Sequence, residues 1–543
     1  MTNPPTHVEE DSTFWAPGTV RLEKLSDEAP RLILQPVPTS DPDDPLNWTT
    51  ARKTLNYGLV CFYVLWTFVQ LDIGFTAWGP MQQELMLSVD QLNASAAMNY
   101  GGLAVGCIFF IPLVHKHGRR LLYLISSVLQ LASVIWLAKT NNFGDLMGSN
   151  LLAGLGGAIS ETVVQITIAD IFFVHQHGTM NGWYLIFTSI GAFLGPVASG
   201  YVVKSQGWRW IWWWCVIFLV LNLLLVMFLF EESKYIPVLN GHGAPQMTGS
   251  LDEGEGNDTQ KPAKQDDDSH QDPMERIQSR IDTTMPRKTY RQRMALLTTT
   301  SGPIKQHFWQ PVVLLFTFPA VAFAAVTYGT ILASFAILTS VQAIYLLQPP
   351  YNFGSEGVGL MNVAPFVGAC IGFFFGGYFN DKLIVWLSKR NGGIYEPEQR
   401  LWVSLPSIVL LPGSIIMFGV GLSHGAHWAV LAVAFGIFGF NFLLVNDIAL
   451  AYVTDCYQEL VGDALVGVVF IRNVLSVVVL FSLTPWTNGM GIQNVHILVA
   501  FIIFAVLLLP IPLLIWGKKA RMATAVRYRE MAMRQPSHRT LPE

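Results

Sequence analysis

The sequence predicts an all-α membrane protein with twelve transmembrane helices in two six-helix pseudo-repeats. Three observations carry this prediction: the low charge, twelve long apolar runs, and one polar stretch that separates the runs into two sets of six. Of the 543 residues, 52% are hydrophobic and only 13% are charged, whereas soluble domains carry roughly 25% charged residues. A chain with so little charge cannot cover several globular domains with a solvated surface, so the membrane is its expected solvent.

The composition and the spacing of reactive residues exclude several other classes of protein. A net charge of −4 and a sequence pI of about 6.3 leave no large basic face for nucleic acid. The five cysteines are scattered, mostly inside apolar runs, without the spacing of a metal site. The glycines at 154, 156 and 157 fall inside an expected membrane helix, so they do not form a nucleotide-binding loop. We therefore expect no enzyme activity, metal, cofactor or nucleic-acid partner.

Runs of about 20 apolar residues, the length that crosses a bilayer as a helix, follow one another along the chain. A polar, proline-rich tail over 1–53 precedes an N-terminal half over 54–231, and a C-terminal half over 309–517 is followed by a tail over 518–543. The expected spans are 54–79, 92–114, 121–138, 147–172, 182–203 and 211–231 in the first half, and 311–340, 357–379, 401–423, 429–453, 462–485 and 495–517 in the second.

The stretch 232–308 between the two halves has a different composition. It contains acidic segments at 253–256 and 265–269 and almost no aromatic residues. Such a stretch cannot bury enough apolar surface to fold alone. It predicts a polar cytoplasmic linker that is disordered.

The distribution of Lys and Arg predicts the orientation of the helices. All but four of the 33 Lys and Arg residues fall in the two tails and the even-numbered connections; the exceptions are Lys139, Lys204, Arg209 and Arg472. Because cytoplasmic loops carry an excess of positive charge, both termini are predicted in the cytoplasm. The outer end of the sixth span then carries a tryptophan cluster that we interpret as an interfacial anchor, made of Trp208, Trp210, Trp212, Trp213 and Trp214.

The two halves resemble each other in sequence. A shift of 285 residues brings polar and glycine positions of the fourth span onto the tenth, aligning Gly154 with Gly439, Glu161 with Asn446, and Asp170 with Asp455. Twin six-span halves related by an axis along the membrane normal are one of the known transporter plans. Alternating access needs this duplication, whereas channels and receptors rarely have it.

The fifth span contains small residues and one proline at regular spacing. Small residues in this arrangement let two helices approach closely, and proline removes a backbone donor and bends the helix. The pattern predicts either a tight packing face alone, or a hinge or seal in the transport path. Its residues are Gly191, Gly195, Pro196 and Gly200.

Charged residues mark the cytoplasmic ends of several spans. Two loops there are expected to hold one conformation by pairing and capping, and carboxylates at the ends of the fourth and tenth spans are expected to pair with loop Arg or Lys. The loop residues are Gly118, Arg119 and Arg120 after the second span and Gly377, Asp381 and Lys382 at the end of the eighth, and the carboxylates are Asp170 and Asp455.

Ionisable residues inside the spans are the main candidates for function. A charge at the middle of a membrane costs about 2.5–3.5 kcal/mol on insertion scales, so each is retained for a reason. Glu161 lies deep in the fourth span, two turns from Gly154 and one from Gln165, on a polar stripe expected to face a cavity. Asp72 lies in the outer third of the first span. Both carboxylates are candidates for proton coupling or substrate binding, and the alternative for Glu161 is a satisfied structural carboxylate.

A second polar group lies in the tenth and eleventh spans. Asn446 and Asp447 form a polar patch in the tenth span, and Arg472 lies in the eleventh. These residues are expected either to belong to the coupling site or to form a buried ion pair between Asp447 and Arg472.

Several segments have the form of family motifs. Residues 43–48 read Asp-Asp-Pro-Leu-Asn-Trp, residues 191–200 contain Gly-x₃-Gly-Pro-x₂-Ser-Gly, and two further blocks lie at 169–182 and 390–400. Together these motifs resemble a fungal major facilitator superfamily transporter of the twelve-span drug:proton antiporter type. The two blocks resemble a subgroup that includes a yeast cation and polyamine carrier and pumps encoded beside secondary-metabolite genes. The resemblance covers 54–231 and 309–517.

Three positions depart from the family pattern. Ile111 and His115 stand where the loop after the second span has Gly and Asp in the family. The latch there is therefore either weakened or completed by Asp170. Asn150 stands where the fourth span of the family has an arginine that is often tied to proton transfer, so the proton route is expected to differ here.

The resemblance implies a proton-coupled secondary active transporter of the plasma membrane, a functional monomer that exports a small solute, drug or secondary metabolite by alternating access. The acidic residues expected in the cavity favour a cationic or amphipathic solute over an anion. Two alternatives stay open. One is a proton-coupled importer of a cation such as a polyamine, and the other is a non-transporting membrane receptor or scaffold that binds partners through 232–308. The expected partners are the solute, protons and the lipid bilayer.

Overall fold

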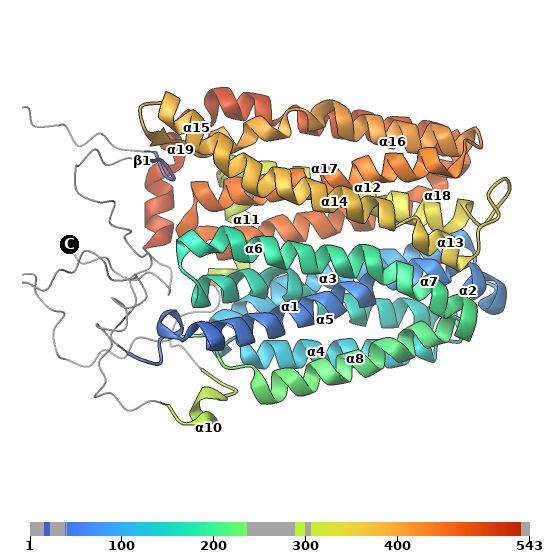
Figure 1. The fold of residues 1–543 in the computed structure, drawn as a ribbon, viewed down its shortest axis with the longest axis horizontal. Coiled ribbons are helices and arrows are strands. Elements are labelled where there is room, and N and C mark those ends of the chain that lie inside the picture. Colours follow the sequence, from blue (N-terminus) through green and yellow to red (C-terminus); the bar gives the residue numbers. More distant parts are fainter. Residues whose placement is uncertain (1–15, 22–38, 40, 236–287, 299–305, 534–543) are drawn as a thin grey trace, which may run out of the picture.

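The computed structural model describes residues 16–21, 39, 41–235, 288–298 and 306–533. Long helices run side by side along one direction and form a single bundle (Figure 1). Strand β1 (Val20–Arg21) and the final helix α19 (Pro510–Ala532) lie at the same end of this bundle. We call it the inner end, because the sequence predicts it in the cytoplasm, and the opposite end the outer end.

Helices dominate the N-terminal half. Capping residues fix where two of the long helices begin: Ser88 and Gln91 form a reciprocal capping box at the start of α3, and the Asn142 side chain accepts the backbone N–H of Asp145 at the start of α5. The elements are η1 (Pro45–Asn47), α1 (Thr50–Asp72), η2 (Ile73–Ala77), α2 (Trp78–Leu85), α3 (Val89–His117), α4 (Arg120–Ala138), α5 (Phe143–Ile171), α6 (Val174–Ser189), η3 (Ile190–Leu194), α7 (Gly195–Gln206) and α8 (Trp208–Leu229).

The C-terminal half repeats this plan with more interruptions. β2 pairs antiparallel with β1 at the inner end, Val20 facing Tyr395. The elements are α10 (Tyr290–Arg293), α11 (Gln306–Thr317), α12 (Pro319–Tyr345), α13 (Ser355–Leu360), α14 (Val363–Phe374), η5 (Phe375–Phe379), α15 (Asn380–Arg390), β2 (Ile394–Tyr395), η6 (Pro397–Ser404), α16 (Ser407–Ser423), α17 (Trp428–Cys456), η7 (Gln458–Leu460) and α18 (Val461–Leu507), followed by α19.

Within the described residues, 11 helical stretches are long and apolar enough to cross a membrane. The last of them, Gln458–Ala532, is 75 residues long and contains two of the expected spans, 462–485 and 495–517. Gly491 lies between these two, with a φ of 78° that breaks the helical path. A helix of 75 residues would be about 110 Å long at 1.5 Å per residue, far more than a bilayer requires, and the break at Gly491 divides it.

The repeat expected from the sequence is visible in how glycines pack. A Cβ atom added to Gly154 of α5 would lie 1.9 Å from the backbone oxygen of Asn99 in α3, and one added to Gly439 of α17 would lie 2.2 Å from that of Pro365 in α14. Both glycines therefore allow close backbone contact between the fourth and the second span of their half, which are α5 and α3 in the first half and α17 and α14 in the second. The pairing of Gly154 with Gly439 is confirmed in this sense.

Adding a methyl group at this contact is expected to destabilise the bundle. Gly154→Ala must push α3 and α5 apart, and overpacking of this kind typically costs about 1–3 kcal/mol. Gly413→Ala in α16 is the matched control, because nothing lies within 4 Å of the Cβ it would add and alanine is the better helix former. Thermal unfolding in detergent should show a lower midpoint for Gly154→Ala only; equal midpoints would contradict the close contact.

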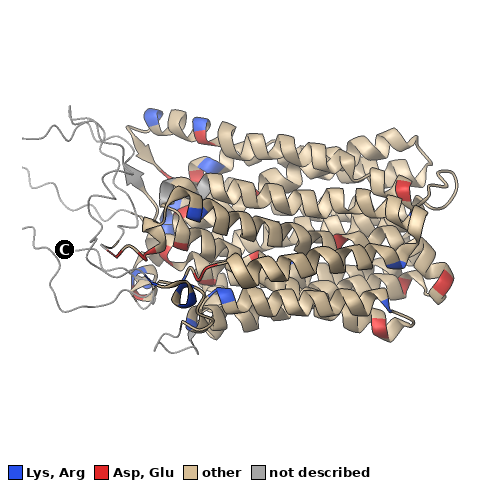
Figure 2. Ribbon diagram, turned by 60° about the horizontal axis from the view of Figure 1, so that its bottom comes forward, with Lys and Arg blue, Asp and Glu red and all other residues tan. Residues whose placement is uncertain are grey.

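Charged residues gather at the two ends of the bundle and are sparse between them (Figure 2). Both described flanks of the stretch 232–308 belong to the inner end. The Glu232 carboxylate accepts the backbone N–H groups of Arg119 and Arg120, and the backbone N–H of Glu232 donates to the carbonyl oxygen of Arg293. The flanks 232–235 and 288–298 are thus bound to the N-terminal half, while 236–287 and 299–305 lie outside the described residues.

Candidate functional site

Residues from both halves enclose a cavity inside the bundle. The centre of a water molecule can occupy about 90 Å³ of it, several times the roughly 10–15 Å³ that one buried water requires. Aromatic and aliphatic side chains form most of the wall. The polar and charged lining residues are Asp72, Ser95, Asn99, Tyr100, Asn150, Glu161, Thr188, Ser189, Tyr328, Asn446 and Arg472.

A buried ion pair joins the two halves across this cavity. Arg472 of α18 pairs through Nη2 with Oε1 of Glu161 on α5, and Asn473 Nδ2 donates to Glu161 Oε2 at 3.0 Å. The side chains of Glu161 and Arg472 are only 4% and 5% exposed. The guanidinium carbon of Arg472 also lies 4.6 Å from the centre of the Tyr328 ring, within the range of a cation–π contact. Glu161 is therefore satisfied by partners from the opposite half.

Asp72 faces the same cavity without such a partner. It ends α1 where the chain tightens into η2, and the residue is 8% exposed. Within the described part of the chain, its carboxylate has no hydrogen bond and no ion pair; its charge interacts with that of Glu161. An unpaired carboxylate that faces a cavity can take up a proton or hold a cation.

The cavity brings together some of the predicted site residues and excludes others. Asn446 lines it, and both polar atoms of the Asn446 side chain are buried without a hydrogen-bond partner among the described residues. Gln165 is half-buried and is not among the lining residues. The interpretation of Asp447 and Arg472 as an ion pair is wrong. Arg472 pairs with Glu161, while the Asp447 carboxylate lies against Gly376 of η5, 2.9 Å from the position a Cβ would take there.

Sequence reasoning missed part of the wall. Trp212 was grouped with the interfacial tryptophans, but it is 3% exposed and lines the cavity, while Trp210 and Trp214 are exposed as expected of anchors. Asn99 and Tyr100 of α3 also line the cavity. Asn99 is a polar residue within an apolar run, which is the signal that could have indicated it.

The fifth-span pattern packs against both halves. A Cβ added to Gly191 would lie 2.7 Å from the Leu65 oxygen of α1, and one added to Gly200 would lie 2.6 Å from the oxygen of Ser355, the first residue of α13. Gly195 is in ordinary contact with Val69, and the carbonyl of Pro196 lies against Gly359 of α13. Close packing is therefore present, and it includes contacts between the halves. Residues Ile190–Leu194, which include Gly191 and come directly before Gly195, form a π-helical turn. Such turns are often found at functional sites.

Each half has an arginine–aspartate ion pair at its inner end. Arg119 Nε lies 2.8 Å from Asp170 Oδ2 in the first half. In the second half, Arg400 pairs with Asp455 and lies 3.5 Å from Asp381. Both aspartates aligned by the 285-residue shift thus pair with an arginine near the inner end of their own half, and a latching role for these pairs stays a prediction.

The remaining predicted loop residues lie outside these two carboxylate pairs. Gly118 has a φ of 104°, which lets the chain turn so that Arg119 and Arg120 present their N–H groups to Glu232. Lys382 places its ammonium 4.4 Å from the centre of the Tyr378 ring, and Gly377 has open space where a Cβ would be. Burial, with a further contribution from the charge of Arg119, lowers the pKa of Lys234 at the inner end to about 8.

Removing the carboxylate of Asp170 is expected to loosen the inner end. Asp170→Asn deletes a charge-assisted interaction with Arg119, and hydrogen bonds to charged groups are worth about 1.5–3 kcal/mol. Hydrogen–deuterium exchange should speed up at the inner ends of α3 and α5. Asp381→Asn is the control, because its side chain is 68% exposed and its contact with Arg400 is longer. Unchanged exchange in Asp170→Asn would contradict a latching role.

Comparison with known proteins adds independent findings. The family model described as Major Facilitator Superfamily matches residues 58–480. An uncharacterized MFS-type transporter of Schizosaccharomyces pombe is 30% identical, with 94% of each chain covered. Protein HOL1 of Saccharomyces cerevisiae is 28% identical over 93% of each chain, and efflux pump radE of Floropilus chiversii is 24% identical over 94% of this chain and 89% of its own. The crystal structure of the human organic anion transporter MFSD10 (TETRAN) matches 84% of this chain and 99% of its own with a TM-score of 0.52 at 13% identity, which shows a shared fold.

Proposed function

Because the chain belongs to the Major Facilitator Superfamily, we propose that it exports a small cationic or amphipathic organic solute across the plasma membrane in exchange for protons. That it is a multi-pass membrane transporter of the fungal type, and not an enzyme, follows from the family and from its relatives. The direction, the coupling ion, the solute class, the membrane and a monomeric working state are parts of the proposal. One relative carries the name efflux pump, which supports the outward direction.

The observation that carries the solute class is the charge of the cavity. Its lining contains two carboxylates, Asp72 and Glu161, and one guanidinium, Arg472. When all three are ionised, the cavity has one negative charge in excess, and a single cation neutralises it. Because the site is poorly solvated, an uncompensated anion in place of that cation would be strongly disfavoured. The aromatic side chains of the wall, which include Tyr100 and Trp212, can stack on an organic cation, whereas the Tyr328 ring already contacts Arg472.

The proposed cycle uses Asp72 as the exchangeable group. A proton and the solute cation compete for its carboxylate, so the cavity carries one or the other but not both. Contacts between the halves exist at the outer end, where Lys204 Nζ lies 2.6 Å from Glu356 Oε1, and at the inner end, where α3 packs against α11 and α18. In alternating access these two ends open one at a time. The Glu161–Arg472 pair links the two halves at the cavity between these ends.

The sign of proton movement tests the proposal. Proteoliposomes with a trapped pH dye receive permanently charged organic cations from outside, without an imposed pH gradient, and protein-free liposomes serve as the control. Exchange predicts that the lumen becomes alkaline, since protons leave as cations enter. Acidification would contradict export and establish cation uptake with protons. No pH change across a broad panel of cations would contradict proton coupling and favour the scaffold alternative, whose partner binding does not need flux.

A further inference from the structure

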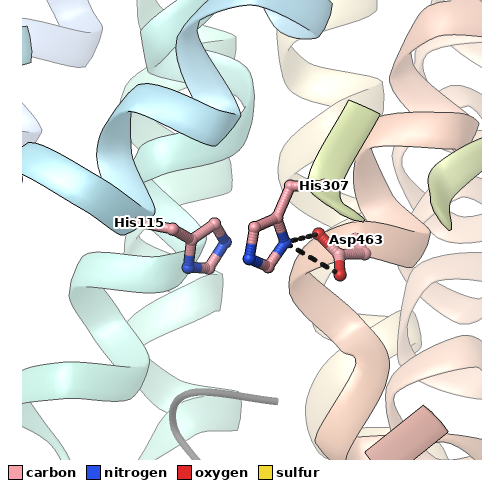
Figure 3. A group of neighbouring side chains, drawn as sticks. All are labelled: His115, His307 and Asp463. Carbon is pink, nitrogen blue, oxygen red and sulfur yellow. Dashed lines mark hydrogen bonds and ion pairs between the residues drawn. The ribbon is translucent and has the colours of Figure 1, made fainter. Parts of the chain in front are cut away.

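Two histidines and an aspartate from distant parts of the chain meet at the inner end of the bundle. His115 lies in the last turn of α3 in the N-terminal half, and His307 and Asp463 lie in the first turns of α11 and α18 in the C-terminal half. Figure 3 shows the two imidazole rings facing each other, with the His307 ring directed at the carboxylate of Asp463. The ring centres are 4.3 Å apart and the rings are within 10° of parallel. This cluster takes no part in the cavity described above.

The donor atoms of the cluster are close enough to share one metal ion. One ligand atom from each residue can be chosen so that all three lie within 4.8 Å of one another. In a tetrahedral zinc site the ligand atoms lie 2.0–2.2 Å from the metal and therefore about 3.4 Å from each other. Side-chain rotations that move the ligand atoms by about 1 Å would bring the three of them to this spacing. His307 Nδ1 already lies 3.1 Å from Asp463 Oδ1 and 3.3 Å from Oδ2.

A second observation concerns the His115 side chain. The Nε2 atom of His115 is buried and has no hydrogen-bond partner among the described residues. Buried polar nitrogens are normally satisfied, and each exception requires an explanation. The side chains of His307 and Asp463 are only 5% and 1% exposed, so two of the three ligands lie inside the protein.

We propose that His115, His307 and Asp463 bind a borderline transition-metal cation, of which Zn²⁺ is the representative, and that this ion joins the two halves at the inner end. Two imidazoles and one carboxylate suit zinc and its neighbours, with water in the fourth position. Calcium and magnesium prefer sets of six or more oxygen ligands and are not expected to bind. The sequence showed no metal motif because the three ligands are 192 and 156 residues apart along the chain.

The position of the site gives it a regulatory consequence. Opening the inner end requires the end of α3 to separate from α11 and α18, which moves His115 away from the other two ligands. An ion bound by all three residues therefore binds the inner-closed state better than the inner-open one and shifts the population toward closure. This effect on transport rests on the proposed function, whereas metal binding itself does not.

Zinc titration of the purified full-length protein tests the site directly. The wild type should bind one Zn²⁺ per chain by isothermal titration, and His115→Ala should weaken binding at least tenfold. His117→Ala is the matched control, because it removes a histidine two residues along the same helix that is not part of the cluster. His115→Gln replaces the alanine variant if the latter does not fold. Absent wild-type binding, or equal affinity in His115→Ala, would overturn the proposal.

Two further readouts separate this inference from the proposed function. Bound Co²⁺ should give the visible absorption of a tetrahedral site in the wild type and lose it in His115→Ala. In the flux assay, micromolar zinc should slow wild-type transport and leave His115→Ala at its own zinc-free rate. Zinc binding in a protein without flux would overturn the transport proposal alone. Flux that zinc slows equally in both proteins would overturn the regulatory role of this site.

Discussion

Replacing Asp72 by asparagine is expected to reduce proton-coupled flux to the level of protein-free liposomes. Its carboxylate lines the cavity without a hydrogen bond or ion pair in the described part of the chain, so the substitution removes a negative charge that no protein group needs. Asparagine has almost the same shape and cannot take up or release a proton near neutral pH. The loss of flux should therefore occur without loss of folding, because a buried unpaired charge is itself costly.

The measurement is the pH-dye assay with purified Asp72→Asn, together with its thermal unfolding midpoint. Asp90→Asn is the matched control, because Asp90 is an exposed carboxylate in the first turn of α3 and is not among the residues that line the cavity. Asp72→Asn should unfold at or above the wild-type temperature and show no exchange of cations for protons. Asp90→Asn should have the wild-type unfolding midpoint and the wild-type exchange. Wild-type flux in Asp72→Asn would remove Asp72 from the coupling site and leave Glu161 as the remaining acidic candidate in the cavity.

Breaking the Glu161–Arg472 pair is expected to destabilise the protein strongly. Glu161→Gln leaves the guanidinium of Arg472 in a site where its side chain is 5% exposed, and removing one member of a buried pair typically costs about 3–5 kcal/mol. Arg472→Gln should have a similar effect by leaving the carboxylate alone. The double variant removes both charges, so most of the lost stability should return although the ionic link between the halves is gone.

Thermal unfolding of the two single variants and the double variant gives the coupling between the residues. Glu356→Gln is the control, since its partner Lys204 is 63% exposed and surface pairs contribute about 0–1 kcal/mol. A double variant as unstable as the sum of the two single ones would contradict a direct pair. Flux in the double variant then reports whether the pair is needed for transport or only for assembly of the two halves.

The hydrophobic pattern determined the membrane class and most of the helices, because bilayer thickness alone sets the length of apolar run that a span needs. It also located Asp72, Glu161, Asn446 and Arg472, since polar residues inside such runs are conspicuous. It placed the break between the eleventh and twelfth expected spans correctly, at a gap that contains Gly491. The repeat of Gly154 and Asp170 in Gly439 and Asp455 was visible for the same reason: small and charged residues stand out in an apolar sequence.

The hydrophobic pattern could not predict which of these charged residues form ion pairs with each other. Arg472 has acidic residues available on several helices, and the sequence favoured Asp447 in a neighbouring span, whereas the fold gives it Glu161 from the other half. Trp212 and Trp210 are the same residue type and lie only two positions apart on α8. Residues two positions apart point to different faces of a helix, so Trp212 is buried and Trp210 is exposed.

Residue type and hydropathy are enough to predict the local features of this chain: apolar helices, polar ends, a duplicated half and a few charges within the membrane. The packed helices are needed to show which charges meet, that Asp72 has no ion pair among the described residues, and that His115, His307 and Asp463 lie together at the inner end. The two kinds of feature differ because hydrophobicity acts on each residue according to its own type. Ion pairs and metal ligands depend on distances between residues that the chain brings together only when the two halves pack.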